Sequence, residues 1–439
     1  MATSPALAYS LLCDATSLLL YQSVLENEVG QSFLHLLQAI HQVEQSTTPD
    51  PAAHLECLRA YSGWFNHLAK RNQDWAEHLV TRILRDDNPF TRQASCRDWS
   101  ELPEPLVNAA RQDLQGLQHL ADCNSASLST WIATTCLVPS PLVWQTDFHP
   151  PPGSPWEWFQ QSPDWQMLVE PLASYYRAHG TGMVSEYRAF RWQAGHLVGI
   201  PHPDPVRLSH LVGYEAQREA LLKNTEFLLA GYPALHVLLY GSRGSGKSSL
   251  VKALLHEYGE AGLRLIEVGK SDLRELSAIA DQLREFPQKF IIFVDDLSFE
   301  EDEDTFKALK VVLEGNLTAR PQNVVVYATS NRRHLIREFF GDRPRPKDSD
   351  EVHAWDTVQE KLSFSDRFGL TLTFEPPNQA SYLQIVHHLA KQAGIDLPES
   401  DLEFQALQWA TRHNGRSGRT ARQFIDFLKA DLSLFGESQ

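Results

Sequence analysis

The stretch Gly241-Ser-Arg-Gly-Ser-Gly-Lys-Ser248 decides the fold, because it fits the pattern G-x-x-x-x-G-K-[ST]. It follows the apolar run His236-Val-Leu-Leu-Tyr240 and precedes a predicted helix that begins at about Lys247. A strand, a glycine loop and a helix in this order form a phosphate-binding loop, whose backbone N–H groups and helix N-terminus face the anion. In such a loop Lys247 would reach the β- and γ-phosphates, and Ser248 would hold Mg²⁺. The alternative interpretation, an ordinary glycine turn before a helix, is disfavoured by the preceding strand.

A second apolar run, Lys289-Phe-Ile-Ile-Phe-Val294, ends in two adjacent acids, Asp295 and Asp296. Continuous apolar runs of this kind are typical of strands in a parallel sheet that is covered on both faces. The carboxyl end of such a strand lies at the sheet edge where ligands of α/β proteins bind. We therefore expect Asp295 to hold the Mg²⁺ shell and Asp296 to be the catalytic base that polarises the attacking water. The alternative, two acids that open a solvated loop, suits the acidic run 300–304 better than Asp295.

A third predicted strand, Asn323-Val-Val-Val-Tyr-Ala328, is followed by Thr329-Ser-Asn331. A polar side chain at this point can orient water against a γ-phosphate, so Asn331 is a candidate catalytic residue. The alternative is an Asn that only forms a turn.

Together these segments resemble the AAA+ ATPases, and within that superfamily a group of bacterial proteins known as domain of unknown function 815. The resemblance implies a P-loop AAA+ core of the α/β class with a parallel sheet, followed by a small C-terminal helical lid. The segments that carry it are 211–217, 241–248, 294–300, 328–334, 360–369 and 415–422.

The resemblance also implies roles for single residues. The nucleotide-binding residues would be Gly213, Tyr214, Gly241, Ser242, Arg243, Gly244, Ser245, Gly246, Lys247, Ser248 and Ser249, of which the first two would line the adenine pocket. Ser248 and Asp295 would hold the metal ion. The catalytic residues would be Asp296, Asn331 as sensor 1, Arg367 as the arginine finger and Arg419 as sensor 2, with Arg422 as the alternative sensor 2. AAA+ enzymes usually carry Glu at the position of Asp296, and a side chain one methylene shorter predicts slow hydrolysis or a switch that holds ATP.

The composition is that of an ordinary globular protein, with 42% hydrophobic and 21% charged residues among 439. No apolar run approaches the roughly 20 residues that a membrane span needs. The first basic residue is Arg59, which fits neither a secretory signal nor an Arg-rich transit peptide. Five Cys residues without a C-x-x-C pair indicate reduced thiols in a cytoplasmic protein rather than a zinc site. The net charge of −16 argues against a protein that lives on nucleic acid.

Four parts are predicted along the chain: a mostly α-helical N-terminal domain (1–195), a linker (196–205), the AAA+ α/β domain (206–376) and the helical lid (377–439). The N-terminal helices follow from apolar residues at helical spacing between Leu18 and Ile40. The linker follows from the run Ile200-Pro-His-Pro-Asp-Pro205, in which proline restricts the backbone. Lid helices are expected at 382–392, 402–412 and 420–434. The Trp-rich segment 156–165 is either part of a core or a docking patch.

These features predict an ATPase that uses ATP and Mg²⁺ and assembles with copies of itself. Motion of the lid against the core would remodel or scaffold a protein partner held by the N-terminal domain. One alternative is a nucleic-acid loader or initiator that uses the basic cluster 332–347, with six Lys and Arg residues against two acids. Another is a slow or non-hydrolysing ATP-switched interaction module, which Asp296 favours. A protein-threading ring is disfavoured, because no aromatic residue occurs in 269–274 after the predicted strand 263–268.

Overall fold

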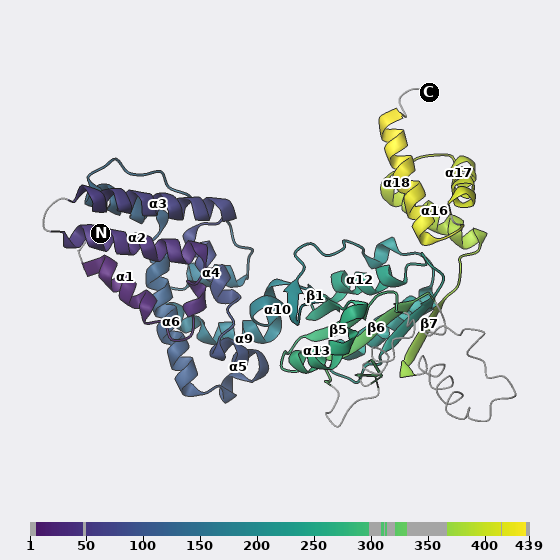
Figure 1. Cartoon of the computed structure of the whole chain (residues 1–439), viewed down its shortest axis with the longest axis horizontal. Helices are drawn as coiled ribbons and strands as arrows, with labels where there is room; N and C mark the ends of the chain where they lie inside the picture. Colours follow the sequence, from purple (N-terminus) through teal and green to yellow (C-terminus); the bar gives the residue numbers. More distant parts are fainter. Residues whose placement is uncertain are drawn as a thin grey trace, which may run out of the picture. The chain divides into compact units, whose positions relative to one another are not determined.

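The computed structural model describes residues 6–46, 50–297, 309–310, 312–313, 321–331, 367–413 and 415–435. The chain divides into two compact units, a helical unit (Met1–Glu186) and a sheet unit (Tyr187–Gln439). Figure 1 shows the two units and the labels of their elements. The helices of the helical unit are α1 (Ala6–Thr16), α2 (Glu28–Gln45), α3 (Pro51–Arg71), α4 (Trp75–Leu84), α5 (Pro89–Cys96), α6 (Glu104–Asp122), α7 (Ser125–Cys136), α8 (Pro155–Gln161), α9 (Val169–His179) and α10 (Gly182–Glu186).

Side-chain caps fix where several of these helices begin. The Asn27 side chain accepts hydrogen bonds from the backbone N–H groups of Val29 and Gly30 at the start of α2. Asp74 and Glu77 form a reciprocal capping box at the start of α4. Each such cap is worth about 1 kcal/mol, because it satisfies a donor that the helix itself leaves unpaired.

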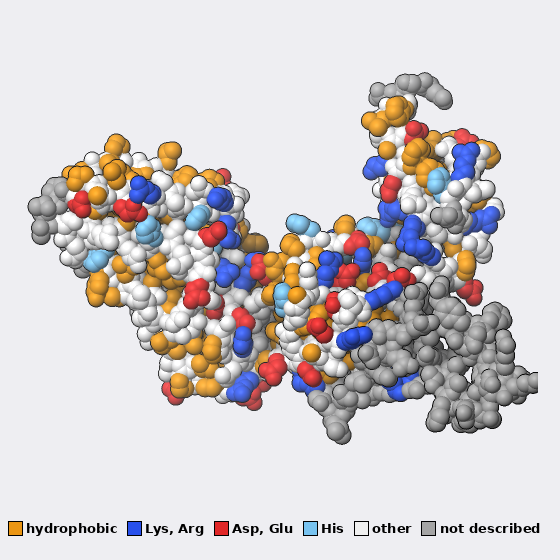
Figure 2. Space-filling model, in the orientation of Figure 1, with side chains coloured by type: hydrophobic (Ala, Val, Ile, Leu, Met, Phe, Trp, Pro, Cys, Tyr) orange, Lys and Arg blue, Asp and Glu red, His pale blue; other side chains and the backbone are white. Residues whose placement is uncertain are grey.

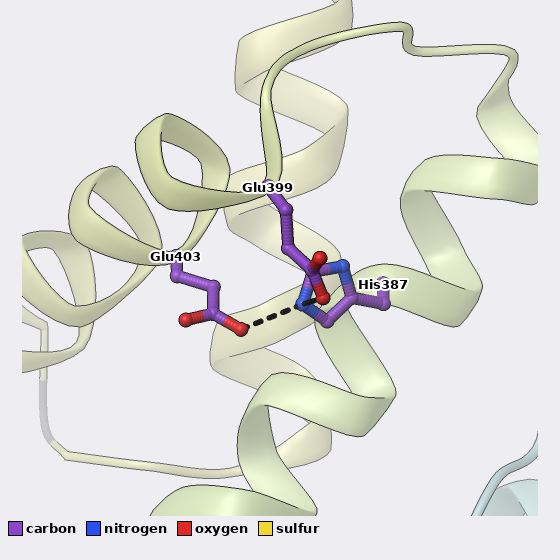
Figure 3. Close-up of side chains that lie close together, drawn as sticks. All are labelled: His387, Glu399 and Glu403. Atoms are coloured by element: carbon purple, nitrogen blue, oxygen red, sulfur yellow. Dashed lines mark hydrogen bonds and ion pairs between the residues drawn. The ribbon is translucent and has the colours of Figure 1, made fainter.

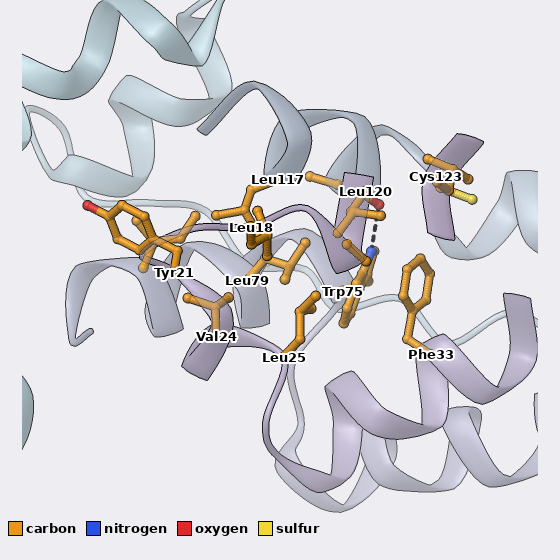
Figure 4. Packing of buried hydrophobic residues seen from close by; sticks show 14 of the residues in the cluster. Leu18, Tyr21, Val24, Leu25, Phe33, Trp75, Leu79, Leu117, Leu120 and Cys123 are labelled. Atoms are coloured by element: carbon orange, nitrogen blue, oxygen red, sulfur yellow. Dashed lines mark hydrogen bonds between the residues drawn. The ribbon is translucent and has the colours of Figure 1, made fainter. Parts of the chain in front are cut away.

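The core of the helical unit combines aliphatic and aromatic side chains, among them Tyr21, Phe33 and Trp75 (Figure 4). The rings of Phe33 and Trp75 stack with centroids 4.1 Å apart, and Trp75 Nε1 donates to Leu120 O at 2.8 Å. Trp165 is 5% exposed, and its ring meets the Phe159 ring edge-on at 4.7 Å. The Trp-rich segment is therefore part of the core. On the face shown in Figure 2, acidic and basic side chains are interspersed over this unit.

A buried carboxylate on helix α6 binds the backbone of the segment that follows α1. Asp113 is 1% exposed, and its two oxygens accept hydrogen bonds from the backbone N–H groups of Leu19, Leu20 and Tyr21 at 2.7–3.0 Å. These N–H groups belong to an irregular segment without helix or sheet partners of its own. The carboxylate therefore replaces the secondary structure that would otherwise satisfy them.

The sheet unit is built on a mixed sheet of seven strands within the described residues, in the order β2-β1-β4-β5-β6-β3-β7. Its strands are β1 (Ala189–Gln193), β2 (His196–Gly199), β3 (Val237–Gly241), β4 (Leu263–Glu267), β5 (Lys289–Val294), β6 (Val324–Ser330) and β7 (Leu370–Phe374). Neighbouring strands are parallel except for the antiparallel pair β1 and β2. All seven residues of β6 are buried, as expected for a strand covered on both faces. The expected α/β core, with a mainly parallel sheet and the glycine loop after β3, is confirmed.

Helices α11 (Glu215–Leu229), α12 (Lys247–Tyr258) and α13 (Leu276–Leu283) accompany the sheet, with short 3-10 turns at Leu208–His210 and Lys270–Glu275. The lid follows the last strand and consists of α16 (Gln379–Ala393), α17 (Glu399–Arg412) and α18 (Gly418–Phe435). It has a small core of its own, in which Tyr382, Ala406 and Phe424 are buried. Among the described helices, none is both long and apolar enough to cross a bilayer.

We expected residues up to 195 to be helical and residues 196–205 to form a linker. Both expectations are wrong for residues 189–199, which form two strands. Residues 189–193 and 196–199 form a hairpin that joins the sheet through β1 and β4, so the compact units meet at 186–187. The turn residues Ala194 and Gly195 both have positive φ, which is the backbone of a two-residue hairpin loop. Buried and exposed residues alternate over the last four residues of β1, which is the period of a strand.

We predict that Asp113→Ala lowers the free energy of unfolding of the helical unit by about 3 kcal/mol or more. Each backbone N–H that loses its only buried partner costs about 1–3 kcal/mol. Eight of the eleven Trp residues lie in this unit, so urea unfolding followed by Trp fluorescence measures the effect. Asp122→Ala at the exposed end of the same helix is the matched control and should change stability by less than about 0.5 kcal/mol. Equal midpoints for the two variants would contradict the role given to Asp113.

Candidate nucleotide site

A cavity of about 690 Å³ lies at the carboxyl ends of β3, β5 and β6. These strands are neighbours in the sheet, so the residues that follow them meet at one edge. The lid helices α16 and α18, the segment 204–214 and Arg218 of the next helix contribute further walls. The lining includes Gly213, Tyr214, Arg243, Gly244, Ser245, Gly246, Lys247, Ser248, Ser249, Asp295, Asp296, Asn331, Arg419 and Arg422.

The glycine loop after β3 needs its glycines for backbone conformation. Gly244 and Gly246 have φ of 77° and 91°, values that L side chains rarely adopt. Gly241 is needed for space as well, because a Cβ there would lie 2.0 Å from Phe374 O. Gly241 and Ser242 do not line the cavity. They form the base of the loop, where Ser242 N donates to Phe374 O at 2.9 Å.

Lys247 holds a buried positive charge at the centre of this loop. It is 5% exposed, and its Nζ donates to Ser242 O at 2.7 Å, Gly241 O at 3.1 Å and Asn331 Oδ1 at 3.3 Å. Burial lowers the pKa of the Lys247 ammonium, and the Asp295 and Asp296 carboxylates oppose part of that shift. A bound anion in the cavity would supply a negative charge next to this desolvated ammonium.

Asp295 and Ser248 form a pair of oxygen ligands suited to Mg²⁺. Ser248 Oγ donates to Asp295 Oδ1 at 2.7 Å, and Thr329 Oγ1 donates to the same oxygen at 2.5 Å. The three residues come from α12, β6 and the end of β5. Hard oxygen donors at a phosphate site are the environment in which Mg²⁺ is usually held, with substrate phosphate and water completing its shell. The residues present therefore fit the ion that the sequence implied.

Asp296 lies beside Asp295 but in a different environment. Its Oδ1 accepts a hydrogen bond from Asn331 Nδ2 at 2.8 Å, and its Oδ2 lies 3.7 Å from Lys270 Nζ. Its side chain is 62% exposed. The backbone has φ of 52°, a left-handed conformation that Asp and Asn tolerate better than most residues. This conformation gives a physical reason for Asp at a position where Glu is usual.

The opposite end of the cavity is apolar. Gly213 and Tyr214 have φ of 82° and 59°, and the Tyr214 hydroxyl donates to Glu375 O. The Tyr214 ring packs against Phe374 with centroids 4.9 Å apart. Ile385 and Leu389 of the lid complete this end. Sequence motifs did not single out these two residues, because they are ordinary apolar positions of an amphipathic helix.

Both candidate sensor arginines of the lid line the cavity. The backbone N–H of Arg419 donates to Gly244 O at 3.2 Å, so the start of α18 contacts the glycine loop directly. Arg419 also contributes to the lowered pKa of Lys247. Arg422 lies one helical turn farther along α18. The two guanidinium-bearing residues thus line the same cavity, and only Arg419 also makes a backbone contact with the glycine loop.

Arg367 is not among the residues that line the described part of the cavity, and it is half-buried just before β7. Its neighbours 361–366 and the basic cluster 332–347 lie outside the described residues, as does the acidic run 300–304. The structure thus brings together Lys247, Ser248, Asp295, Asp296 and Asn331, but it does not bring Arg367 to them.

Besides Ile385 and Leu389, two polar residues of the site were missed by sequence reasoning. Thr329 is bonded to Asp295 through its hydroxyl, and the same oxygen accepts a hydrogen bond from Asp296 N at 3.0 Å. Its place at the end of a predicted strand was a usable signal. Lys270, which faces Asp296, follows the neighbouring strand β4, and no motif distinguishes it.

The family described as "Protein of unknown function (DUF815)" matches residues 185–432, more than half of the chain. This match confirms the family resemblance inferred from the motifs. A search of curated proteins found no match to the chain.

Several solved structures are similar to about half of this chain at low identity. One is the Thermotoga maritima RuvB Holliday junction branch migration motor, at 16% identity with a TM-score of 0.36 over 53% of this chain and 67% of that chain. Another is the FIGL-1 AAA domain in complex with ADP, at 19% identity with a TM-score of 0.35 over 54% and 77%. A DNA replication initiation factor has 16% identity and a TM-score of 0.34 over 52% and 66%. TM-scores this low say nothing about the reaction or the partners of this chain.

We predict that Lys247→Ala weakens ATP binding by about 2–3 kcal/mol, a roughly 30- to 150-fold rise in Kd. The variant loses a charge-assisted contact to phosphate, while the glycines that set the loop backbone are unchanged. Isothermal titration calorimetry measures the affinity. Lys289→Ala, at the amino end of β5 and the opposite edge of the sheet, is the control and should bind ATP as the wild type does. Unchanged affinity in Lys247→Ala would refute the assignment of the site.

We predict that Asp296→Asn binds ATP normally but turns it over about 10²–10⁴-fold more slowly, the usual contribution of a general base. Asn tolerates the left-handed backbone and keeps an Oδ1 acceptor for Asn331, so the local structure should survive. A phosphate-release assay beside a binding measurement separates the two effects. Asp281→Asn on α13 is the control. If Asp296→Asn hydrolyses ATP at the wild-type rate, another acid is the base.

Proposed function

The chain belongs to the DUF815 family, and we propose that it is an ATPase that binds ATP with Mg²⁺ in this cavity and hydrolyses it slowly. The observation that carries the proposal is the convergence of a buried Lys247, a glycine loop and the Ser248–Asp295 pair at one sheet edge. This arrangement offers a positive charge, backbone donors and oxygen ligands to a polyphosphate bound to a metal ion.

In the proposed reaction, the protein contributes positioning and charge neutralisation. Bound Mg²⁺ would neutralise charge on the β- and γ-phosphates, with Ser248 and Asp295 holding its shell. Lys247 would exchange its loop carbonyl partners for phosphate oxygens. Asp296 would accept a proton from the attacking water, while Asn331 fixes the carboxylate and orients that water.

Slow turnover follows from the partners of Asp296. Its carboxylate is hydrogen-bonded by Asn331 and lies 3.7 Å from Lys270 Nζ, so Oδ1 already accepts a hydrogen bond and is less available to an attacking water. It is also one methylene shorter than Glu, so its oxygens lie farther from the γ-phosphate. These features also favour a second function, an ATP-switched module whose bound state persists between rare hydrolysis events.

The position of the lid would depend on whether the bound nucleotide carries a γ-phosphate. It contacts the glycine loop through Arg419 N, and it contacts the segment before α11 through His388 Nε2 and Gln392 Nε2, which lie 2.7 and 2.8 Å from Ser209 O. Loss of the γ-phosphate would change the first set of contacts while leaving the second in place. The lid would then move relative to the core.

We propose further that the output of this motion is the remodelling or scaffolding of a protein partner through the helical unit. The net charge of −16 and the mixed charges on the visible face of that unit support a protein partner over nucleic acid. The basic cluster 332–347, on which a nucleic-acid role would depend, lies outside the described residues.

Homo-oligomerisation is part of the proposal, with Arg367 acting in the site of a neighbouring copy. The motif around Arg367 matches the AAA+ arginine finger, and Arg367 does not line the described cavity of its own chain. An arginine that neutralises transition-state charge is worth roughly 10³-fold or more in rate.

We predict that Arg367→Ala and Lys247→Ala are each inactive alone but regain partial ATP hydrolysis when mixed. An intact site on one copy can then use an intact arginine on the other. Specific activity of the wild type should also rise with protein concentration. Two separate preparations of Lys247→Ala, mixed in the same way, are the control and should stay inactive. Full activity of Arg367→Ala, or a specific activity independent of concentration, would exclude action between copies.

A further inference from the structure

Three side chains of types that can bind a metal ion lie close together within the lid, away from the cavity described above (Figure 3). His387 extends from α16, and Glu399 and Glu403 extend from the first turns of α17. One ligand atom from each residue lies within 4.8 Å of the others. The spacing of four residues places both carboxylates on one face of α17, toward the imidazole.

The distances are those of a coordination site as well as of an ion pair. His387 Nε2 lies 2.9 Å from Glu403 Oε1 and 3.6 Å from Glu399 Oε1. Around a tetrahedral ion with bonds of about 2.0–2.2 Å, neighbouring ligand atoms are separated by about 3.3–3.6 Å. The 3.6 Å distance lies at the upper end of that range and the 2.9 Å distance lies below it. Small side-chain movements that lengthen the His387–Glu403 contact would therefore place all three atoms around one ion.

We propose that His387, Glu399 and Glu403 form a site for a divalent transition-metal ion, of which Zn²⁺ is the best match, with water completing the coordination. An imidazole nitrogen beside carboxylates suits Zn²⁺ and its neighbours in the first transition row, whereas Mg²⁺ prefers oxygen ligands alone. The site is thus chemically distinct from the Ser248–Asp295 pair. His387 and Glu403 are about one-third exposed, which leaves the ion open to solvent on one side.

Occupancy of this site would cross-link α16 to α17. Helix α16 also carries Ile385 and Leu389 in the wall of the nucleotide cavity, and His388 in contact with Ser209. A metal ion that fixes α16 against α17 would therefore stabilise the lid without touching the nucleotide. The site is independent of ATP binding, so its test does not depend on the proposed ATPase activity.

The experiment is a Zn²⁺ titration of the full-length reduced protein in competition with a chromophoric chelator. An excess of Mg²⁺ is present to occupy the oxygen ligands near the glycine loop. We expect one Zn²⁺ whose affinity falls by at least about 10- to 100-fold in His387→Gln and Glu403→Gln, since even the loss of an outer hydrogen bond costs that much. His388→Gln on α16 and Asp401→Asn on α17 are matched controls that remove a neighbouring imidazole and a neighbouring carboxylate.

Glu399→Gln is the third variant, because this side chain is 79% exposed and its replacement leaves the packing of the lid unchanged. Reduced Zn²⁺ affinity in a variant with wild-type circular dichroism supports a lid site. Zn²⁺ binding that is equal in His387→Gln and the wild type would place the ion elsewhere, for example on the free thiols, and would overturn the proposal. Absence of Zn²⁺ binding by the wild type would show that the three residues form only an ion pair.

Discussion

The carboxylate of Asp295 is the point on which the candidate site depends. One of its oxygens accepts hydrogen bonds from Ser248, from Thr329 and from the backbone of Asp296. It thereby links the first turn of α12 to the ends of two neighbouring strands, β5 and β6. Removing this carboxylate would remove the hydrogen bonds that join Ser248 of α12 and Thr329 of β6 at this point. One hydrogen-bonded centre thus fixes the positions of Ser248, Thr329 and the backbone of Asp296 relative to the Asp295 carboxylate.

The two adjacent acids differ because their backbones differ. Asp295 directly follows the last residue of β5, and Asp296 has already turned into the left-handed region. Successive residues of a strand point to opposite faces, and the positive φ adds a further change of direction. Asp295 consequently meets Ser248, while Asp296 meets Asn331 and Lys270. Asp tolerates this left-handed conformation better than Glu does. The short side chain at this position is therefore consistent with the positive φ of its backbone.

Two helices of the lid contact different parts of the candidate site. Its helix α18 contacts the glycine loop at Gly244, and its helix α16 contributes to the apolar end of the cavity. A different part of α16 faces α17 through His387 and its two carboxylate neighbours. A rigid pair of helices transmits small displacements at the phosphate better than a loose one. The stiffness of the α16–α17 pair is therefore a property on which nucleotide-dependent motion would depend.

The sequence by itself determined the parts whose signal is local. The glycine loop, the acids after β5, Asn331 after β6 and the lid helices are each defined by a few consecutive residues and their period. The tertiary structure alone decided which distant side chains meet. It placed β1 and β2 in the sheet, bonded Thr329 to Asp295, turned Lys270 toward Asp296, and gathered His387 with Glu399 and Glu403. These contacts depend on strand order, helix packing and backbone φ, and they join residues that no local pattern relates. Local periodicity selects the elements, whereas the partner of a polar side chain is chosen by whichever donor or acceptor the folded chain brings within about 3 Å.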